Sequence, residues 1–95
     1  MTFDEAVATM PKGWKELEII LKKFADKMSD GKVTLPKANK IVKDLADELN
    51  KINTGDSDKI NEAMCREDIF SFVGKILRVK KVGEALDVLD ENRDF

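Results

Sequence analysis

Two groups of carboxylates stand at a spacing that could serve metal chemistry. Asp44 and Asp47 are three residues apart, as are neighbouring members of a second set, Glu84, Asp87 and Asp90. Residues three apart lie on one side of a helix, and acidic pairs from two helices can hold Mg²⁺ for the cleavage of a nucleotide pyrophosphate. With 19 acidic residues among 95, the same spacing also arises without any function.

This pattern resembles the paired acidic motifs of the all-α nucleotide pyrophosphohydrolases, and the resemblance implies a Mg²⁺-dependent hydrolase. Those enzymes also surround the base with basic and aromatic residues, which these positions do not offer. The hydrolase is therefore kept as the alternative enzyme hypothesis, and the carboxylates are expected on solvated helix faces.

A second segment has part of a metal-binding pattern. Asp26, Asp30 and Gly31 resemble places one, five and six of a calcium-binding EF-hand loop. Place three is Met28, and place twelve, which needs a bidentate carboxylate, is Lys37. The segment is therefore expected to be a polar turn between two helices, with Gly31 in the left-handed conformation that ends the first of them.

Other chemically equipped groups are scarce. The chain has no histidine, which removes the commonest general base and metal ligand. The single cysteine, Cys65, cannot form an internal disulfide, which fits a reducing, cytoplasmic setting. The sequence shows no glycine-rich phosphate loop and no serine in a nucleophile elbow. We therefore expect no catalytic residue, no metal site and no cofactor.

The charge is nearly balanced, with 17 basic and 19 acidic residues and a net charge of −2. This balance argues against general nucleic-acid binding. The densest basic stretch is expected on a solvated helix face; it comprises Lys75, Arg78, Lys80 and Lys81. The sequence has no apolar run of about 18 residues, so we expect no membrane span, and its acidic beginning is unlike a secretory signal.

The elements that carry these residues are predicted to be helices throughout, in a single domain over residues 1–95. Thr2 followed by Glu5 predicts a capping box at a first short helix, which Pro11 and Gly13 close. A chain of 10.7 kDa can bury one modest core without disulfides.

Two longer helices are predicted over residues 14–28 and 35–52. Their apolar residues recur at gaps of three and four, from Trp14 to Met28 and from Leu35 to Ile52. Thr34 is the expected N-cap of the second of these helices, and Gly55 its stop. The short connection predicts an antiparallel hairpin. The stripes could instead join two chains, although two or three heptads are short for a coiled coil.

The second half of the chain changes its apolar side twice. Residues 60–64 and 69–79 have opposite apolar sides at about 100° per residue, which predicts a break or a kink between Cys65 and Asp68, with Asp68 as the candidate cap. A second joint is predicted at residues 80–83, and the acidic tail is expected to fray beyond Leu89. The sequence therefore predicts a compact all-α bundle of five or six helices.

The segment from Ile69 to Val79 is apolar over about half of its circumference. A central core helix explains such a surplus, but an edge of it could instead stay open to a partner. The candidates for partner binding are Phe72 and Val79 at one edge, Phe70 and Leu77 at the other, and Trp14 as an aromatic anchor.

These patterns together predict a small non-enzymatic protein that binds another protein, as an adaptor, an inhibitor or an accessory subunit. A self-associating homodimer is the second hypothesis. Binding of DNA through residues 75–81 is a further and weaker one. The chain is small, rich in lysine and aspartate, and without histidine. This composition is typical of bacterial or phage accessory proteins, which is an analogy and not a sign of homology.

Overall fold

The computed structural model describes residues 1–53 and 63–94, which fold into helices and connecting turns. These ranges hold five α-helices, one 3₁₀ turn and no strand. The elements are α1 (Phe3–Val7), α2 (Lys15–Met28), α3 (Leu35–Asn53), α4 (Ala63–Val79), η1 (Gly83–Ala85) and α5 (Leu86–Asn92). The predicted all-α bundle of five or six helices is therefore confirmed. None of the described helices is long and apolar enough to cross a membrane.

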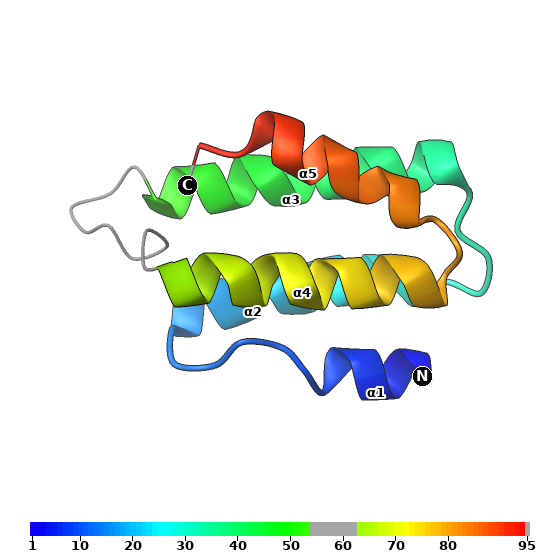
Figure 1. The fold of residues 1–95 in the computed structure, drawn as a ribbon, viewed down its shortest axis with the longest axis horizontal. Helices are drawn as coiled ribbons and strands as arrows, with labels where there is room; N and C mark the ends of the chain where they lie inside the picture. The colour runs from blue at the N-terminus through cyan, green and yellow to red at the C-terminus, as the bar shows by residue number, and fades with distance from the viewer. Residues whose placement is uncertain (54–62, 95) are drawn as a thin grey trace.

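Helices α2 and α3 form the predicted antiparallel hairpin (Figure 1). Two ion pairs show the direction: Lys23 Nζ lies 2.6 Å from Glu48 Oε1, and Lys27 Nζ lies 4.0 Å from Asp44 Oδ2. A later residue of α2 therefore meets an earlier residue of α3. Helix α3 starts directly after Thr34, whose carbonyl accepts a 2.8 Å hydrogen bond from the amide of Ala38. The stop predicted at Gly55 lies outside the described residues.

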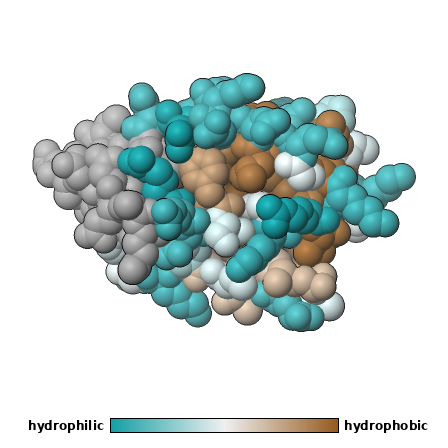
Figure 2. All heavy atoms as spheres, in the orientation of Figure 1, coloured by the Kyte–Doolittle hydropathy of each residue, from teal (hydrophilic) through white to brown (hydrophobic). Residues whose placement is uncertain are grey.

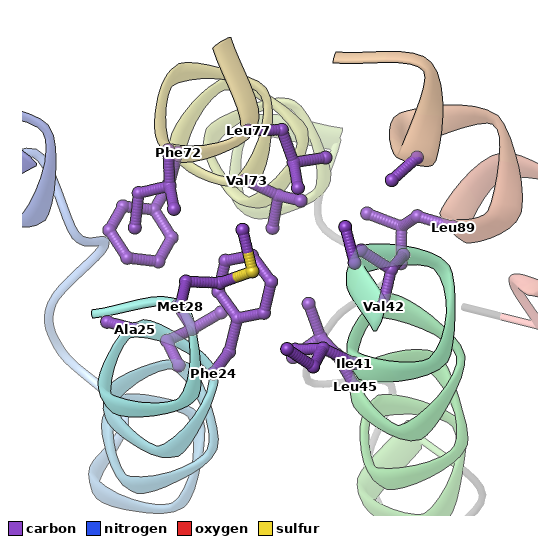
Figure 3. Close-up of a cluster of buried hydrophobic side chains, with 14 of the residues drawn as sticks. Phe24, Ala25, Met28, Ile41, Val42, Leu45, Phe72, Val73, Leu77 and Leu89 are labelled. Atoms are coloured by element: carbon purple, nitrogen blue, oxygen red, sulfur yellow. The ribbon is translucent and has the colours of Figure 1, made fainter. Parts of the chain in front are cut away.

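Helix α4 is covered from several sides. Helix α1 runs along one side of it, and η1 and α5 cover another (Figure 1). Figure 3 shows Phe72 and Val73 of α4 pointing toward Phe24 and Met28 of α2, and Leu77 on the side of α4 that faces Leu89 of α5. All buried side chains of the described residues belong to one apolar cluster, and none of them is polar or charged. Burial of apolar surface is therefore the main stabilising term for this arrangement.

The predicted joint at residues 80–83 is confirmed, and its geometry is specific. The amide of Val82 donates to the Leu77 carbonyl at 2.9 Å, and the amide of Lys81 donates to the Arg78 carbonyl at 3.0 Å. These two bonds form a Schellman motif, in which the residue after the cap takes the left-handed conformation. That residue is Lys81, with φ 62°, and it is the one non-glycine residue with positive φ in the described part of the chain.

A break between Cys65 and Asp68 is contradicted, because α4 is helical from Ala63 through Val79; the alternative of a kink stays a prediction. Asp68 is an exposed residue inside this helix and not its cap. The prediction rested on the opposite apolar sides of residues 60–64 and 69–79. Residues 60–62 lie outside the described part of the chain; within α4, Glu67 and Asp68 are exposed, so neither charge requires the helix to end there.

The predicted fraying beyond Leu89 is also wrong for the described tail. Helix α5 continues to Asn92, and the side chain of Asn50 in α3 holds its end. The amide group of Asn50 donates to the Asn92 carbonyl at 2.8 Å, and its oxygen accepts from the backbone amide of Asp94 at 2.7 Å. One side chain thus satisfies two backbone groups at the helix end, where such groups lack helical partners.

The first helix has the predicted capping box: Thr2 Oγ1 accepts from the Glu5 amide at 3.2 Å, and the Glu5 carboxylate accepts from the Thr2 amide at 3.3 Å. Gly13 has φ +122° at the entry to α2, a conformation that L side chains rarely adopt. Gly31 does not have the expected positive φ, and α2 ends instead with Ser29 in a right-handed conformation.

Candidate functional site

The five carboxylates of the hydrolase hypothesis are all exposed, and three of them lie beside basic side chains. Asp47 Oδ1 lies 2.6 Å from Lys43 Nζ, and Asp44 has Lys27 beside it at 4.0 Å. Asp90 Oδ1 lies 3.4 Å from Arg93 Nε. Within residues 1–53 and 63–94, no cluster of three or more acidic, cysteine or histidine side chains is arranged to hold a metal.

The EF-hand-like segment forms a polar turn between α2 and α3, as predicted, and lysines neutralise its acids. Asp30 Oδ2 lies 3.1 Å from Lys37 Nζ, and Asp26 Oδ1 lies 3.1 Å from Lys22 Nζ. Lys37, which stands where the calcium loop needs its bidentate carboxylate, is thus paired with an acid of the same segment.

Two of the partner-binding candidates, Phe72 and Leu77, lie in the core. Both side chains are fully buried, and the Phe72 ring meets that of Phe24 edge to face, with centroids 6.3 Å apart. Helices α1, α2 and α5 supply enough cover to hide them, which the sequence pattern alone did not indicate. The expectation that Phe72 and Leu77 offer an open edge is therefore corrected.

Phe70 keeps partial exposure at the seam between α4 and α5. The guanidinium of Arg93 lies over its ring, 5.5 Å from the centroid, a cation–π geometry that covers part of the ring. Leu86 is half-buried on the other side of this seam, next to the backbone of Gly74. Figure 2 shows hydrophobic side chains gathered between α4 and α5, with hydrophilic ones around them.

Trp14 is also half-buried, at the N-cap position of α2. It lines a depression of about 280 Å³ together with Leu17, Ile52 and the charged residues Lys15 and Glu16. Part of the indole therefore remains accessible, as an aromatic anchor requires.

Val79 lines a larger hollow, of about 490 Å³, at the end of the bundle where the α2–α3 turn meets the α4–η1 joint (Figure 1). Its walls are residues 31–35 from the turn and residues 79–82 from the joint. The apolar lining is aliphatic and consists of Val33, Leu35, Val79 and Val82, of which Leu35 and Val79 are half-buried and the other two buried.

The charged side chains that line this hollow are all cationic, and Thr34 adds a neutral hydroxyl group. Lys32, Lys80 and Lys81 contribute to the lining, and no acidic residue does. Lys80 is held in place: its Nζ lies 4.9 Å from the Phe3 ring centroid and donates to the Asp30 carbonyl at 3.4 Å. Lys32 and Lys81 are exposed, and no described carboxylate lies within ion-pair distance of either. We call this site, residues 31–35 and 79–82, the lysine-rimmed hollow.

A third depression, of about 400 Å³, surrounds Met10 and Ile19 on the outside of α2. Ile19 is 56% exposed, and sequence reasoning did not single it out. Two of the lysines here already have acidic partners, Lys22 with Asp26 and Lys23 with Glu48. This depression therefore combines an apolar side chain with charges that are largely compensated.

Sequence reasoning named Val79 as a candidate and Lys80 and Lys81 as part of a basic stretch, but it missed Lys32 and Val33 as their neighbours. Nothing in the local pattern signals that contact, because it depends on where the turn between α2 and α3 lies relative to the end of α4. The sequence matches no protein-family model, and comparisons with curated proteins and with solved structures likewise found no match.

Proposed function

We propose that this chain is a non-enzymatic helical protein that acts by binding another protein, as an adaptor, an inhibitor or an accessory subunit. The observation that carries the proposal is the lysine-rimmed hollow, where Val79 and Leu35 stay partly open on a floor of aliphatic side chains. A partner side chain placed there removes apolar surface from water on both sides. A reducing, cytoplasmic setting in a bacterium or a phage-infected cell fits the single cysteine and the small size.

Val79 is suited to a test because it is half-buried at the last position of α4. Val79→Asn removes the apolar contact and leaves all charges unchanged. Ile19→Asn is the matched control, since it makes the same kind of change at the exposed apolar residue of α2. Thermal unfolding of both variants verifies that they remain folded.

The experiment is affinity capture from cells that make the protein, with the wild-type chain and both variants as baits and quantitative mass spectrometry as readout. We expect at least one protein to be retained by the wild-type chain and by Ile19→Asn and lost from Val79→Asn. Equal retention on all three baits, or no specific protein on any, would reject the proposed function. Light scattering over a dilution series addresses the homodimer: a dimer that persists on dilution and is lost in Val79→Asn would replace the proposal with self-association.

A further inference from the structure

The lysine-rimmed hollow has a charge opposite to that of the chain as a whole. The chain carries a net charge of −2, yet the charged side chains that line the hollow are three lysines. The carboxylate of Asp30, in the adjoining turn, is paired with Lys37 at 3.1 Å and does not line the hollow. A local positive potential at an apolar depression selects a ligand that is apolar at its centre and negative at its edges.

We propose that the hollow receives an acidic segment of the partner protein, in which one aliphatic side chain is flanked by carboxylates. This inference rests on the proposed function and names the chemistry of the partner. The aliphatic side chain lies on the floor formed by Val33, Leu35, Val79 and Val82, and the flanking carboxylates pair with Lys32 and Lys81 at the rim. Lys80 adds a third positive charge in a fixed position, because Phe3 and the Asp30 carbonyl hold its ammonium group.

The geometry favours a peptide over the other anions that lysines attract. Single-stranded nucleic acids bind on aromatic side chains that stack with the bases, and the lining of this hollow has none. A lipid surface is reached by apolar side chains that protrude, whereas Val33 and Val82 are buried at 5% and 4% exposure. A chain segment can insert a side chain into a depression, which a flat membrane surface cannot do.

The conformation of Lys81 supports this assignment. A residue at this place of a Schellman motif is usually glycine, because the left-handed conformation is costly for residues with a Cβ. The chain places a lysine there, with φ 62°, at the rim of the hollow. Unfavourable backbone conformations of this kind concentrate at functional sites.

The test is an NMR titration of the ¹⁵N-labelled full chain with capped synthetic peptides. One peptide has a leucine between two pairs of glutamates, and a second replaces every glutamate with glutamine. We expect the acidic peptide to shift the amide signals of residues 31–35 and 79–82, with weaker binding as salt is added. The glutamine peptide should bind at least about fivefold more weakly, as expected for the loss of two or more exposed ion pairs.

Charge-reversal variants test which lysines bind the acidic peptide. The double variant Lys32→Glu with Lys81→Glu should lower the affinity for the acidic peptide by roughly five- to tenfold. Lys40→Glu is the matched control, since Lys40 is an exposed lysine of α3 outside this hollow and its reversal should leave binding unchanged. Lys81→Arg keeps the charge and should retain binding.

Several results would overturn the inference: equal affinity for both peptides, shifts confined to other residues, or an equal loss in Lys40→Glu. Tighter binding of oligothymidylate or of phosphatidylserine vesicles than of the acidic peptide would also overturn it. The bait experiment separates the two proposals. If capture of a protein depends on Val79 but not on Lys32 and Lys81, the proposed function is retained and the proposal of an acidic segment is rejected.

Discussion

The rings of Phe24 in α2 and Phe72 in α4 meet edge to face, with centroids 6.3 Å apart and an angle of 69° between their planes. This contact joins the hairpin to the helix that the sequence marks as most apolar. Both side chains are buried, at 2% and 0% exposure, so the contact is shielded from water. Such a geometry places the positive edge of one ring against the negative face of the other.

The first prediction concerns this aromatic pair. Phe72→Ala should destabilise the chain by about 3–5 kcal/mol, a large part of the total stability of a small protein. Phe72→Leu and Phe24→Leu are gentler variants, and in a double-mutant cycle they should couple by about 0.5–1.5 kcal/mol. Urea denaturation followed by circular dichroism measures both quantities. Strictly additive effects of the two leucine variants would show that the ring geometry contributes nothing beyond burial.

The second prediction compares two glycines. Gly74 lies inside α4, and a Cβ built there would meet Leu86 Cδ2 at 3.6 Å, an ordinary contact distance. Gly74→Ala should therefore stabilise the chain by about 0.5–1 kcal/mol, because alanine loses less backbone entropy in a helix. Gly13→Ala should destabilise it by about 1–3 kcal/mol, since its φ is +122°. Thermal melts of both variants provide the measurement, and shifts of the same sign would contradict this reasoning.

The third prediction concerns the end of α5. Asn50→Ala removes the bonds to the Asn92 carbonyl and the Asp94 amide, and it should cost about 1–2 kcal/mol. Amide hydrogen exchange should accelerate mainly in residues 89–94. Asp47→Ala, which removes an exposed ion pair on the same helix, should change stability by less than about 0.5 kcal/mol. Unchanged exchange of the tail in Asn50→Ala would mean that other contacts hold it.

The fourth prediction separates stability from binding at Lys81. A left-handed lysine costs about 1–2 kcal/mol, and glycine costs about 0.5–1 kcal/mol more backbone entropy, so Lys81→Gly should gain roughly 0.5–1 kcal/mol. The same change removes one rim charge and should weaken binding of the acidic peptide by up to about fivefold. Chemical denaturation and peptide titration measure the two effects. A variant that is less stable than the wild type would show that the Lys81 side chain stabilises the fold itself.

The helices could be predicted because their signals are local. The apolar spacing of α3 depends on residues three and four apart, and Thr34 and Leu35 mark its start directly in the sequence. The joint after α4 could be placed because the apolar side changes there. Its stop residue was not foreseen, since Lys81 takes a conformation for which Gly83, two positions later, is the more typical residue.

Which apolar side chains of α4 stay partly exposed could not be predicted, because their exposure depends on which other helices cover them. Phe72 and Val79 lie at the same edge of the helix, yet Phe72 is in the core and Val79 reaches the hollow. The difference lies along the helix axis. Phe72 is next to Phe24, whereas Val79 stands at the end of α4 against the α2–α3 turn. The apolar periodicity of the sequence does not contain that information. Lys32 and Val33, which line the hollow opposite Val79, are identified only from the assembled structure.

The buried side chains of the described residues are all apolar, and this affects how uniquely the helices are aligned along their axes. Hydrocarbon surfaces tolerate repacking, and a sliding movement of α2 along α3 would orphan no donor or acceptor among the buried side chains of the described residues. The polar contacts that depend on this lengthwise alignment therefore lie at the surface, in the ion pairs of Lys23 with Glu48 and of Lys27 with Asp44. Weakening these peripheral contacts should yield several coexisting alignments before it yields an unfolded chain.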